Sequence, residues 1–268
     1  MNNRPQLFYQ HWIPEGDVVA VVCLVHGLGE HSDRYTHLAH FLNQEGIVLL
    51  AFDLPGHGKS PGLRGYSPGL ESLLDDISFL LNISQTRFRG IPCFLYGHSL
   101  GANLAVIYAL KRPANLSGLI LTGPGFKLNF EPPAWKLFIA RVLGNIMPSL
   151  TMQNELERPA LSRDSEVVKA YVNDPLVHDR VSTRLAMDGI NSGEWALENA
   201  DKLTLPILLA HGGADRLTSV DASKRFAAKV GPACQLVVFD DWYHEVHNEP
   251  EKEVYFQILL KFIKEQVA

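Results

Sequence analysis

The segment Cys93–Ala105 constrains this chain more than any other. A short apolar run ends in Gly97-His-Ser99-Leu-Gly101, and apolar residues at helical spacing follow. This order predicts a buried strand that turns sharply into a helix, with Ser99 on the turn. Glycine suits positions 97 and 101 because a Cβ atom there would collide with the neighbouring chain.

Ser99 at such a turn has two interpretations. Serine is a good N-cap, so the residue could simply cap the following helix. Alternatively, its hydroxyl is an exposed nucleophile at the positive end of a helix dipole, where free N–H groups stabilise a negative oxygen. The flanking sequence favours the second interpretation.

Alternating strands and helices surround this turn. Short apolar, β-branched runs predict buried strands, which lie at 18–25, 47–52, 118–122, 206–210 and 235–239. Helical spacing of apolar residues predicts helices at 35–42, 70–81, 100–110, 220–230 and 250–266. The alternation implies right-handed crossovers and an α/β fold, a mostly parallel, doubly wound sheet with helices on both faces.

The alternation stops between residues 124 and 195. That stretch has no strand-like pattern, only helical segments interrupted by prolines. We therefore expect residues 1–123 and 196–268 to form the core and residues 124–195 to form an inserted helical cap. Within the cap, segment 135–147 is apolar on too many sides for a single core-facing stripe. It could line an acyl tunnel and touch lipid, or simply pack on the body.

Composition excludes several classes of protein. A net charge of −5 with no long block of like charges argues against a nucleic-acid partner. The polar N-terminus and the lack of a long apolar run predict a cytoplasmic protein that is at most peripheral to a membrane. Three widely spaced cysteines argue against a disulfide framework or a metal site and favour buried thiols. The sequence leaves the oligomeric state open.

A serine nucleophile needs a base, and the base needs a group that holds its tautomer. Asp215 follows the predicted strand at 206–210, and His244 follows the strand at 235–239. The carboxyl ends of parallel strands share one edge of a sheet, so Ser99, Asp215 and His244 are expected to converge there.

Other residues compete for two of these roles. His247 lies three residues after His244 and is the alternative base. Asp240 and Asp241 are too close in sequence to His244 to reach its far ring nitrogen easily, and Asp221 is a weaker alternative acid. Asp215 and His244 are preferred.

An oxyanion formed beside Ser99 needs two N–H donors. The segment His26-Gly-Leu-Gly29 follows the first buried strand, so the N–H of Leu28 is expected to join that of Leu100. Each such donor contributes about 3 kcal/mol to barrier lowering. Gly27 is an alternative donor to Leu28.

The order Ser, Asp, His is that of α/β-hydrolases. The chain resembles the monoacylglycerol lipase and lysophospholipase branch of that superfamily. The matching segments occur in the family's order at 26–35, 53–60, 97–101, 173–176, 211–215, 243–245 and 248–250.

The resemblance implies an α/β-hydrolase fold and hydrolysis of an ester with one fatty acyl chain, through an acyl-enzyme on Ser99. No metal or organic cofactor is implied. Glu30, Arg34 and His247 are expected to build a polar pocket for the glycerol end, with Tyr171 facing it from the cap. Alternatively, Glu30 and Arg34 form a surface ion pair.

The sequence is also compatible with two functions other than the hydrolysis of single-chain lipid esters. A short-chain carboxylesterase, thioesterase or serine aminopeptidase would use the same chemistry on another substrate. A binding protein could have the fold without catalysis, although the complete Ser, Asp, His set argues against it. Dehalogenase and epoxide-hydrolase chemistry is disfavoured, since the turn carries serine rather than a carboxylate.

Overall fold

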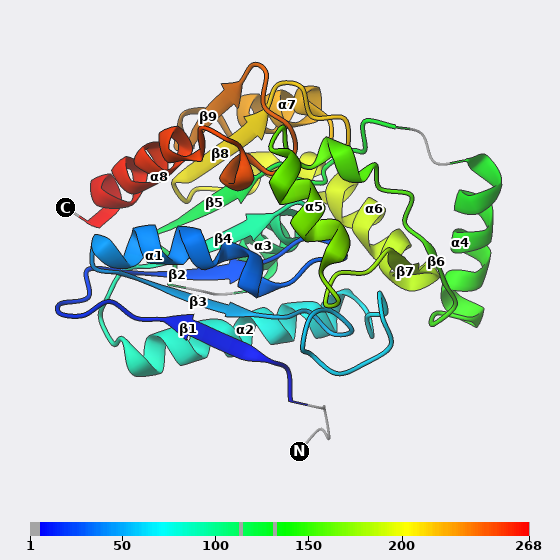
Figure 1. Cartoon of the computed structure of the whole chain (residues 1–268), viewed down its shortest axis with the longest axis horizontal. Helices are drawn as coiled ribbons and strands as arrows, with labels where there is room; N and C mark the ends of the chain where they lie inside the picture. Colours follow the sequence, from blue (N-terminus) through cyan, green and yellow to red (C-terminus); the bar gives the residue numbers. More distant parts are fainter. Residues whose placement is uncertain (1–5, 113–114, 131–132, 268) are drawn as a thin grey trace.

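The computed structural model describes residues 6–112, 115–130 and 133–267, and a seven-stranded sheet lies at its centre (Figure 1). The strand order is β1-β3-β2-β4-β5-β8-β9, and every neighbouring pair is parallel except β1 with β3. The strands are β1 (Tyr9–Trp12), β2 (Ala20–Val25), β3 (Ile47–Phe52), β4 (Cys93–His98), β5 (Gly118–Thr122), β8 (Ile207–Gly212) and β9 (Cys234–Phe239). The predicted mostly parallel sheet is confirmed.

Helices cover both faces of the sheet because alternate residues of each buried strand point to opposite faces. In β2, Val21, Cys23 and Val25 join one apolar cluster with α2, α3 and α7, and the intervening residues join a second cluster with α1 and α8. These helices are α1 (Thr36–Gln44), α2 (Leu70–Arg87), α3 (Leu100–Lys111), α7 (Val220–Val230) and α8 (Lys252–Val267). The doubly wound arrangement is the predicted one.

β1 was not predicted from the sequence. This strand pairs antiparallel with β3 at the sheet edge, with Tyr9 opposite Phe52. Its four residues are only partly buried or exposed, unlike the fully buried β3. A short edge strand has neither the apolar run nor the clear alternation that identified the other strands.

The chain between β5 and β8 lies over the carboxyl end of the sheet (Figure 1). It contains α4 (Ala134–Ile146), β6 (Thr151–Gln153), α5 (Ser165–Asn173), β7 (Arg180–Ser182) and α6 (Thr183–Glu198). The expectation of helices alone was wrong, because β6 and β7 pair antiparallel. Three residues are too few to show strand alternation. The expected boundary at residue 195 falls inside α6.

Short 3-10 helices complete the fold. They are η1 (Ser32–Tyr35), η2 (Arg158–Ala160), η3 (Ala200–Lys202), η4 (Gly231–Ala233) and η5 (Val246–Asn248). Cys23 and Cys93 are buried free thiols with their Sγ atoms 3.8 Å apart, as the apolar surroundings of both residues predict.

Candidate active site

Ser99 lies on the sharp turn between β4 and α3, as the sequence predicts. Its backbone has φ 52° and ψ −114°, a conformation that a residue with a Cβ adopts only when its surroundings hold it there. A Cβ on Gly97 would lie 2.3 Å from the carbonyl oxygen of Gly101, and one on Gly101 would lie 2.1 Å from that of Val25. Both glycines are therefore required for the turn.

Asp215 and His244 follow the neighbouring strands β8 and β9 and meet at one edge of the sheet. His244 Nδ1 lies 2.7 Å from Asp215 Oδ2, and both side chains are buried. The backbone N–H groups of Leu217 and Thr218 donate to Asp215 Oδ1 at 2.7 and 3.0 Å. Because the carboxylate is fixed and faces Nδ1, the other ring nitrogen of His244 is left to exchange a proton.

The charges of this pair reinforce each other. Burial opposes ionisation of Asp215, but the His244 ring and hydrogen bonds from His211 and His244 hold the pKa of Asp215 well below its usual range. Burial also lowers the pKa of His244, yet the charge and hydrogen bond of Asp215 outweigh burial and raise that pKa above 6.5. In His98, burial and the neighbouring His244 lower the pKa to about 4. Of these two histidines, His244 has the better proton affinity for a general base near neutral pH.

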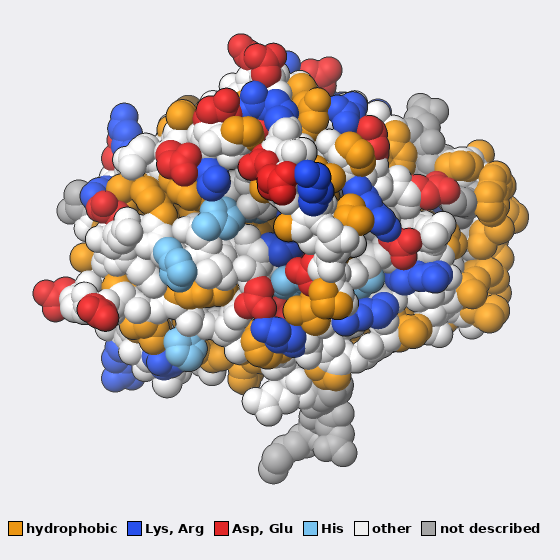
Figure 2. Space-filling model, in the orientation of Figure 1, with side chains coloured by type: hydrophobic (Ala, Val, Ile, Leu, Met, Phe, Trp, Pro, Cys, Tyr) orange, Lys and Arg blue, Asp and Glu red, His pale blue; other side chains and the backbone are white. Residues whose placement is uncertain are grey.

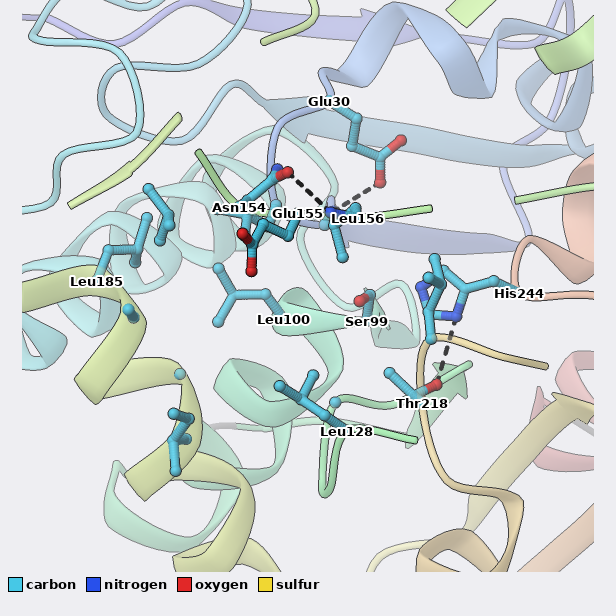
Figure 3. Close-up of a pocket in the computed structure, with 18 of the residues that line it drawn as sticks. Glu30, Ser99, Leu100, Leu128, Asn154, Glu155, Leu156, Leu185, Thr218 and His244 are labelled. Atoms are coloured by element: carbon cyan, nitrogen blue, oxygen red, sulfur yellow. Dashed lines mark hydrogen bonds between the residues drawn. The ribbon is translucent and has the colours of Figure 1, made fainter. Parts of the chain in front are cut away.

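Ser99 and His244 lie side by side on the wall of one pocket (Figure 3). The backbone also brings them together. Ser99 N–H donates to the carbonyl oxygen of Thr122 at 2.9 Å, and a Cβ on the next residue, Gly123, would lie 3.0 Å from His244 Nδ1. The structure thus gathers all three residues of the predicted triad at one place.

The competing residues lie elsewhere. His247 is fully buried, and its ring stacks on Tyr35 with 4.5 Å between the ring centroids. Within the described part of the chain, neither ring nitrogen of His247 has a hydrogen-bond partner. Asp240 and Asp241 are exposed, and Asp221 pairs with a lysine on α7. The structure therefore favours His244 over His247 and Asp215 over the other carboxylates.

The loop after β2 packs against Ser99. A Cβ on Gly27 would lie 3.2 Å from the Cβ of Ser99. The N–H of Gly27 already donates to Glu30 Oε1 at 2.7 Å, so Gly27 is the weaker candidate for an oxyanion donor. Leu28 and Leu100 both line the pocket, which leaves their N–H groups as the better candidates.

Glu30, Arg34 and Glu245 form a buried ion-pair network behind the pocket. Arg34 Nη1 donates to Glu30 Oε2 and to Glu245 Oε1, each at 2.6 Å, and Nη2 donates to Glu245 Oε2 at 2.6 Å. The side chain of Arg34 is 9% exposed, so a surface ion pair is excluded. Arg34 also lies 4.7 Å from the ring centroid of Tyr171, which faces the pocket from α5.

Two of the residues predicted for the polar pocket are not on its wall. Glu30 and Tyr171 line it, whereas Arg34 and His247 lie outside the lining. Arg34 is drawn back by its two carboxylate partners, and His247 is held in the stack on Tyr35. His247 thus lies behind the wall of the pocket, and Arg34 contacts the pocket residues Glu30, Glu245 and Tyr171.

Three residues of the site were not predicted from the sequence. Glu245 lines the pocket and holds Arg34. Thr218 Oγ1 donates to Asp215 Oδ2 at 2.8 Å, and His211 Nε2 lies 3.1 Å from the same oxygen. All three are near a predicted triad residue in sequence, but adjacency does not tell which neighbours turn inward.

The rest of the pocket is apolar and extends from Ser99 toward the segment between β5 and β8 (Figure 3). Its larger apolar residues come from both parts of the chain and are Leu28, Leu100, Leu128, Phe130, Leu137, Met152, Leu156, Leu161, Val181, Leu185, Ile190 and Leu217. A polar end near Glu30 and a long apolar remainder suit a ligand with one polar and one aliphatic part.

Comparisons with known proteins agree with this geometry. The family described as serine aminopeptidase, S33, matches residues 16–251. The chain belongs to this family. A related monoacylglycerol lipase from Mycolicibacterium smegmatis is 34% identical over 93% of this chain and 89% of that protein.

This S33-family chain is also 37% identical to an uncharacterized abhydrolase domain-containing protein from Dictyostelium discoideum; the match covers 99% of this chain and 28% of that protein. The crystal structure of Paleococcus ferrophilus monoacylglycerol lipase is similar with a TM-score of 0.90 and 35% identity, covering 97% of this chain and 99% of that one. The resemblance seen in the motifs is confirmed. The chain is a carboxylic ester hydrolase with the α/β-hydrolase fold.

Proposed function

We propose that the protein hydrolyses monoacylglycerols or similar single-chain lipid esters through an acyl-enzyme on Ser99. The observation that carries the proposal is the position of Ser99 beside the paired His244 and Asp215, in a pocket that is polar at one end and apolar beyond. The printed names of the relatives from Mycolicibacterium smegmatis and Paleococcus ferrophilus support the same substrate class.

The first chemical step makes the acyl-enzyme. His244 Nε2 accepts the hydroxyl proton of Ser99 while Oγ bonds to the ester carbonyl carbon. The N–H groups of Leu28 and Leu100 stabilise the resulting oxyanion by about 3 kcal/mol each. His244 then donates its proton to the alcohol oxygen as the ester C–O bond breaks. Water repeats the sequence on the acyl-enzyme and releases the fatty acid.

The polar end of the pocket suits the alcohol part of the substrate. Carboxylate oxygens of Glu30 and Glu245 accept hydrogen bonds from hydroxyl groups, and the phenol of Tyr171 donates one. Arg34 keeps both carboxylates ionised, since its charge lowers the pKa of Glu30 and of Glu245 despite their burial. A glycerol end therefore meets fixed acceptors.

We further propose that residues 124–195 act as a cap that touches a lipid surface. α4 exposes Phe138, Val142 and Ile146. Figure 2 shows hydrophobic side chains along the edge where Figure 1 has α4. Within the described residues, each helix is too short or too polar to span a bilayer. Contact through the outer face of α4 would let the enzyme take substrate from a membrane without crossing it.

Replacing Ser99 with Ala tests the proposed function. The variant should lose about four to six orders of magnitude in kcat on monoolein and lose labelling by a fluorophosphonate probe, while its circular dichroism stays unchanged. A panel of monoacylglycerols, lysophospholipids, short-chain esters, thioesters and an aminoacyl amide would define the substrate. Near wild-type turnover by the variant, or a wild type that prefers the amide, would reject the proposal.

A further inference from the structure

Two glycines on the same face of α6 differ in why they are glycine. Gly189 and Gly193 are four residues apart, so they lie one turn from each other. A Cβ on Gly193 would lie 2.6 Å from the carbonyl oxygens of Gly125 and Phe126, so packing requires glycine there. Among the described residues, a Cβ on Gly189 would come within 4 Å of Leu100 Cδ1 alone, at an ordinary contact distance of 3.6 Å. Packing therefore does not require glycine at position 189.

Glycine in the middle of a helix is also unfavourable. It loses more backbone entropy on folding than alanine does, so a glycine inside a helix destabilises the fold relative to alanine. A glycine that packing does not require therefore suggests a functional reason. The backbone at this position is held in place as well. The carbonyl oxygen of Gly189 accepts hydrogen bonds from Ser192 Oγ at 2.7 Å and from Asn103 Nδ2 at 3.3 Å. A side chain added at 189 would therefore have to occupy the open space beside Leu100.

Gly189 belongs to the wall of two cavities. One is the pocket that contains Ser99, and the other lies between α4, α6 and the segment after β5. The residues that line both are Gly125, Leu128, Phe130, Leu137, Gly189 and Ile190. The outer cavity adds Phe126, Met187 and Leu197 to its wall. Leu100, which faces Gly189, directly follows Ser99 on the wall of the pocket (Figure 3). Gly189 is thus close to the reacting serine in the chain fold and also lines the outer cavity.

We propose that the two cavities connect beside Gly189 and that this position determines acyl-chain length, because without a side chain there the distal carbons of a long acyl chain enter the outer cavity. The inference rests on the proposed function and names a specificity-determining position for it. The apolar residues that line both cavities and the lack of a side chain at 189 point to an aliphatic occupant that is continuous with the chain bound beside Ser99.

The test compares Gly189→Leu with wild type on monobutyrin and monopalmitin in the same detergent. The leucine should lower kcat/KM for monopalmitin by at least about tenfold relative to kcat/KM for monobutyrin, the size of effect that an altered apolar pocket produces. Gly189→Ala should shift the ratio in the same direction by less. Gly144→Ala on α4 is the matched control for Gly189→Ala, because Gly144 belongs to the lining of neither cavity and a Cβ there would lie at an ordinary contact distance of 3.7 Å from the carbonyl oxygen of Thr183. Its ratio should equal that of wild type.

Folding is measured alongside by thermal unfolding. Gly189→Leu should melt no lower than wild type, because leucine favours the helix and the site has room. A much lower melting temperature would mean that the space does not exist and would overturn the inference. An unchanged ratio, or an equal fall for both esters, would also overturn it. A wild type that cleaves neither ester would instead reject the proposed function.

Discussion

α3 and α4 are both rich in apolar residues but have opposite surroundings. Both carry apolar residues around most of their circumference. Every residue of α3 from Leu100 to Tyr108 is buried, because the helix packs between the sheet, α2 and α6. α4 packs on α6 but leaves Phe138 68% exposed and Ile146 72% exposed. Figure 2 shows hydrophobic side chains along the edge where Figure 1 has α4.

The difference shows that a helix with apolar residues on all sides can either be buried in the core or expose an apolar face. A helix that is apolar on every side needs either protein or another apolar medium around it. The fold supplies protein around α3, so its apolar residues stabilise the core. The fold uses only the inner face of α4, where Leu137 and Ala140 line the pocket. The outer face of α4 is therefore available for the proposed contact with lipid.

The largest expected effect tests the two helices by stability. Leu104→Ala in α3 should lower the free energy of unfolding by about 2–5 kcal/mol, because the side chain is 1% exposed and its loss leaves a cavity. Phe138→Ala in α4 should change it by less than about 0.5 kcal/mol. Urea unfolding followed by circular dichroism measures both. Equal losses would mean that α4 is packed as tightly as α3.

A second prediction concerns membrane contact. Phe138→Ser combined with Ile146→Ser should weaken association with phospholipid vesicles by at least about tenfold, because two large apolar side chains no longer enter the lipid. Hydrolysis of a water-soluble short-chain ester should not change. Val254→Ser on α8 removes another exposed apolar residue and serves as the control. Wild-type sedimentation of the double variant with vesicles would remove α4 from the contact surface.

The smallest expected effect compares buried with exposed charges. His244 must be neutral to accept the serine proton, so kcat/KM should fall as the pH decreases through the raised pKa of His244, above 6.5. The acid limb of the pH profile is this fall in kcat/KM at low pH. Glu245→Gln should move the acid limb to lower pH by less than about one unit, because the Glu245 charge helps raise the pKa of His244. Arg141→Gln, which removes an exposed charge on α4, should leave the acid limb unchanged.

The pH profiles also provide the counter-test. If Glu245→Gln leaves the acid limb in place, the carboxylate does not act on His244. If Arg141→Gln moves the acid limb as far as Glu245→Gln does, the buried charge of Glu245 affects the pKa of His244 no more than the exposed charge of Arg141 does.

Much of the site was predictable because its signals are local. The glycines around Ser99 and the apolar run before it define the turn, and the residues after β8 and β9 supply Asp215 and His244. Each residue follows a strand that is recognisable by composition alone, and parallel strands end at one edge. The network of Arg34 with Glu245 was not predictable, since 211 residues separate the two partners.

The sequence by itself determined the order of the buried strands of the main sheet and of the helices between them, the sharp turn at Ser99 and the strand ends that carry Asp215 and His244. These features depend on side-chain periodicity and turn chemistry over a few residues. Only the tertiary structure decided that His247 stacks away from the pocket, that Arg34 is buried between two carboxylates and that Gly189 has open space beside it. Burial and the choice of partner depend on distant parts of the chain, which no local pattern records.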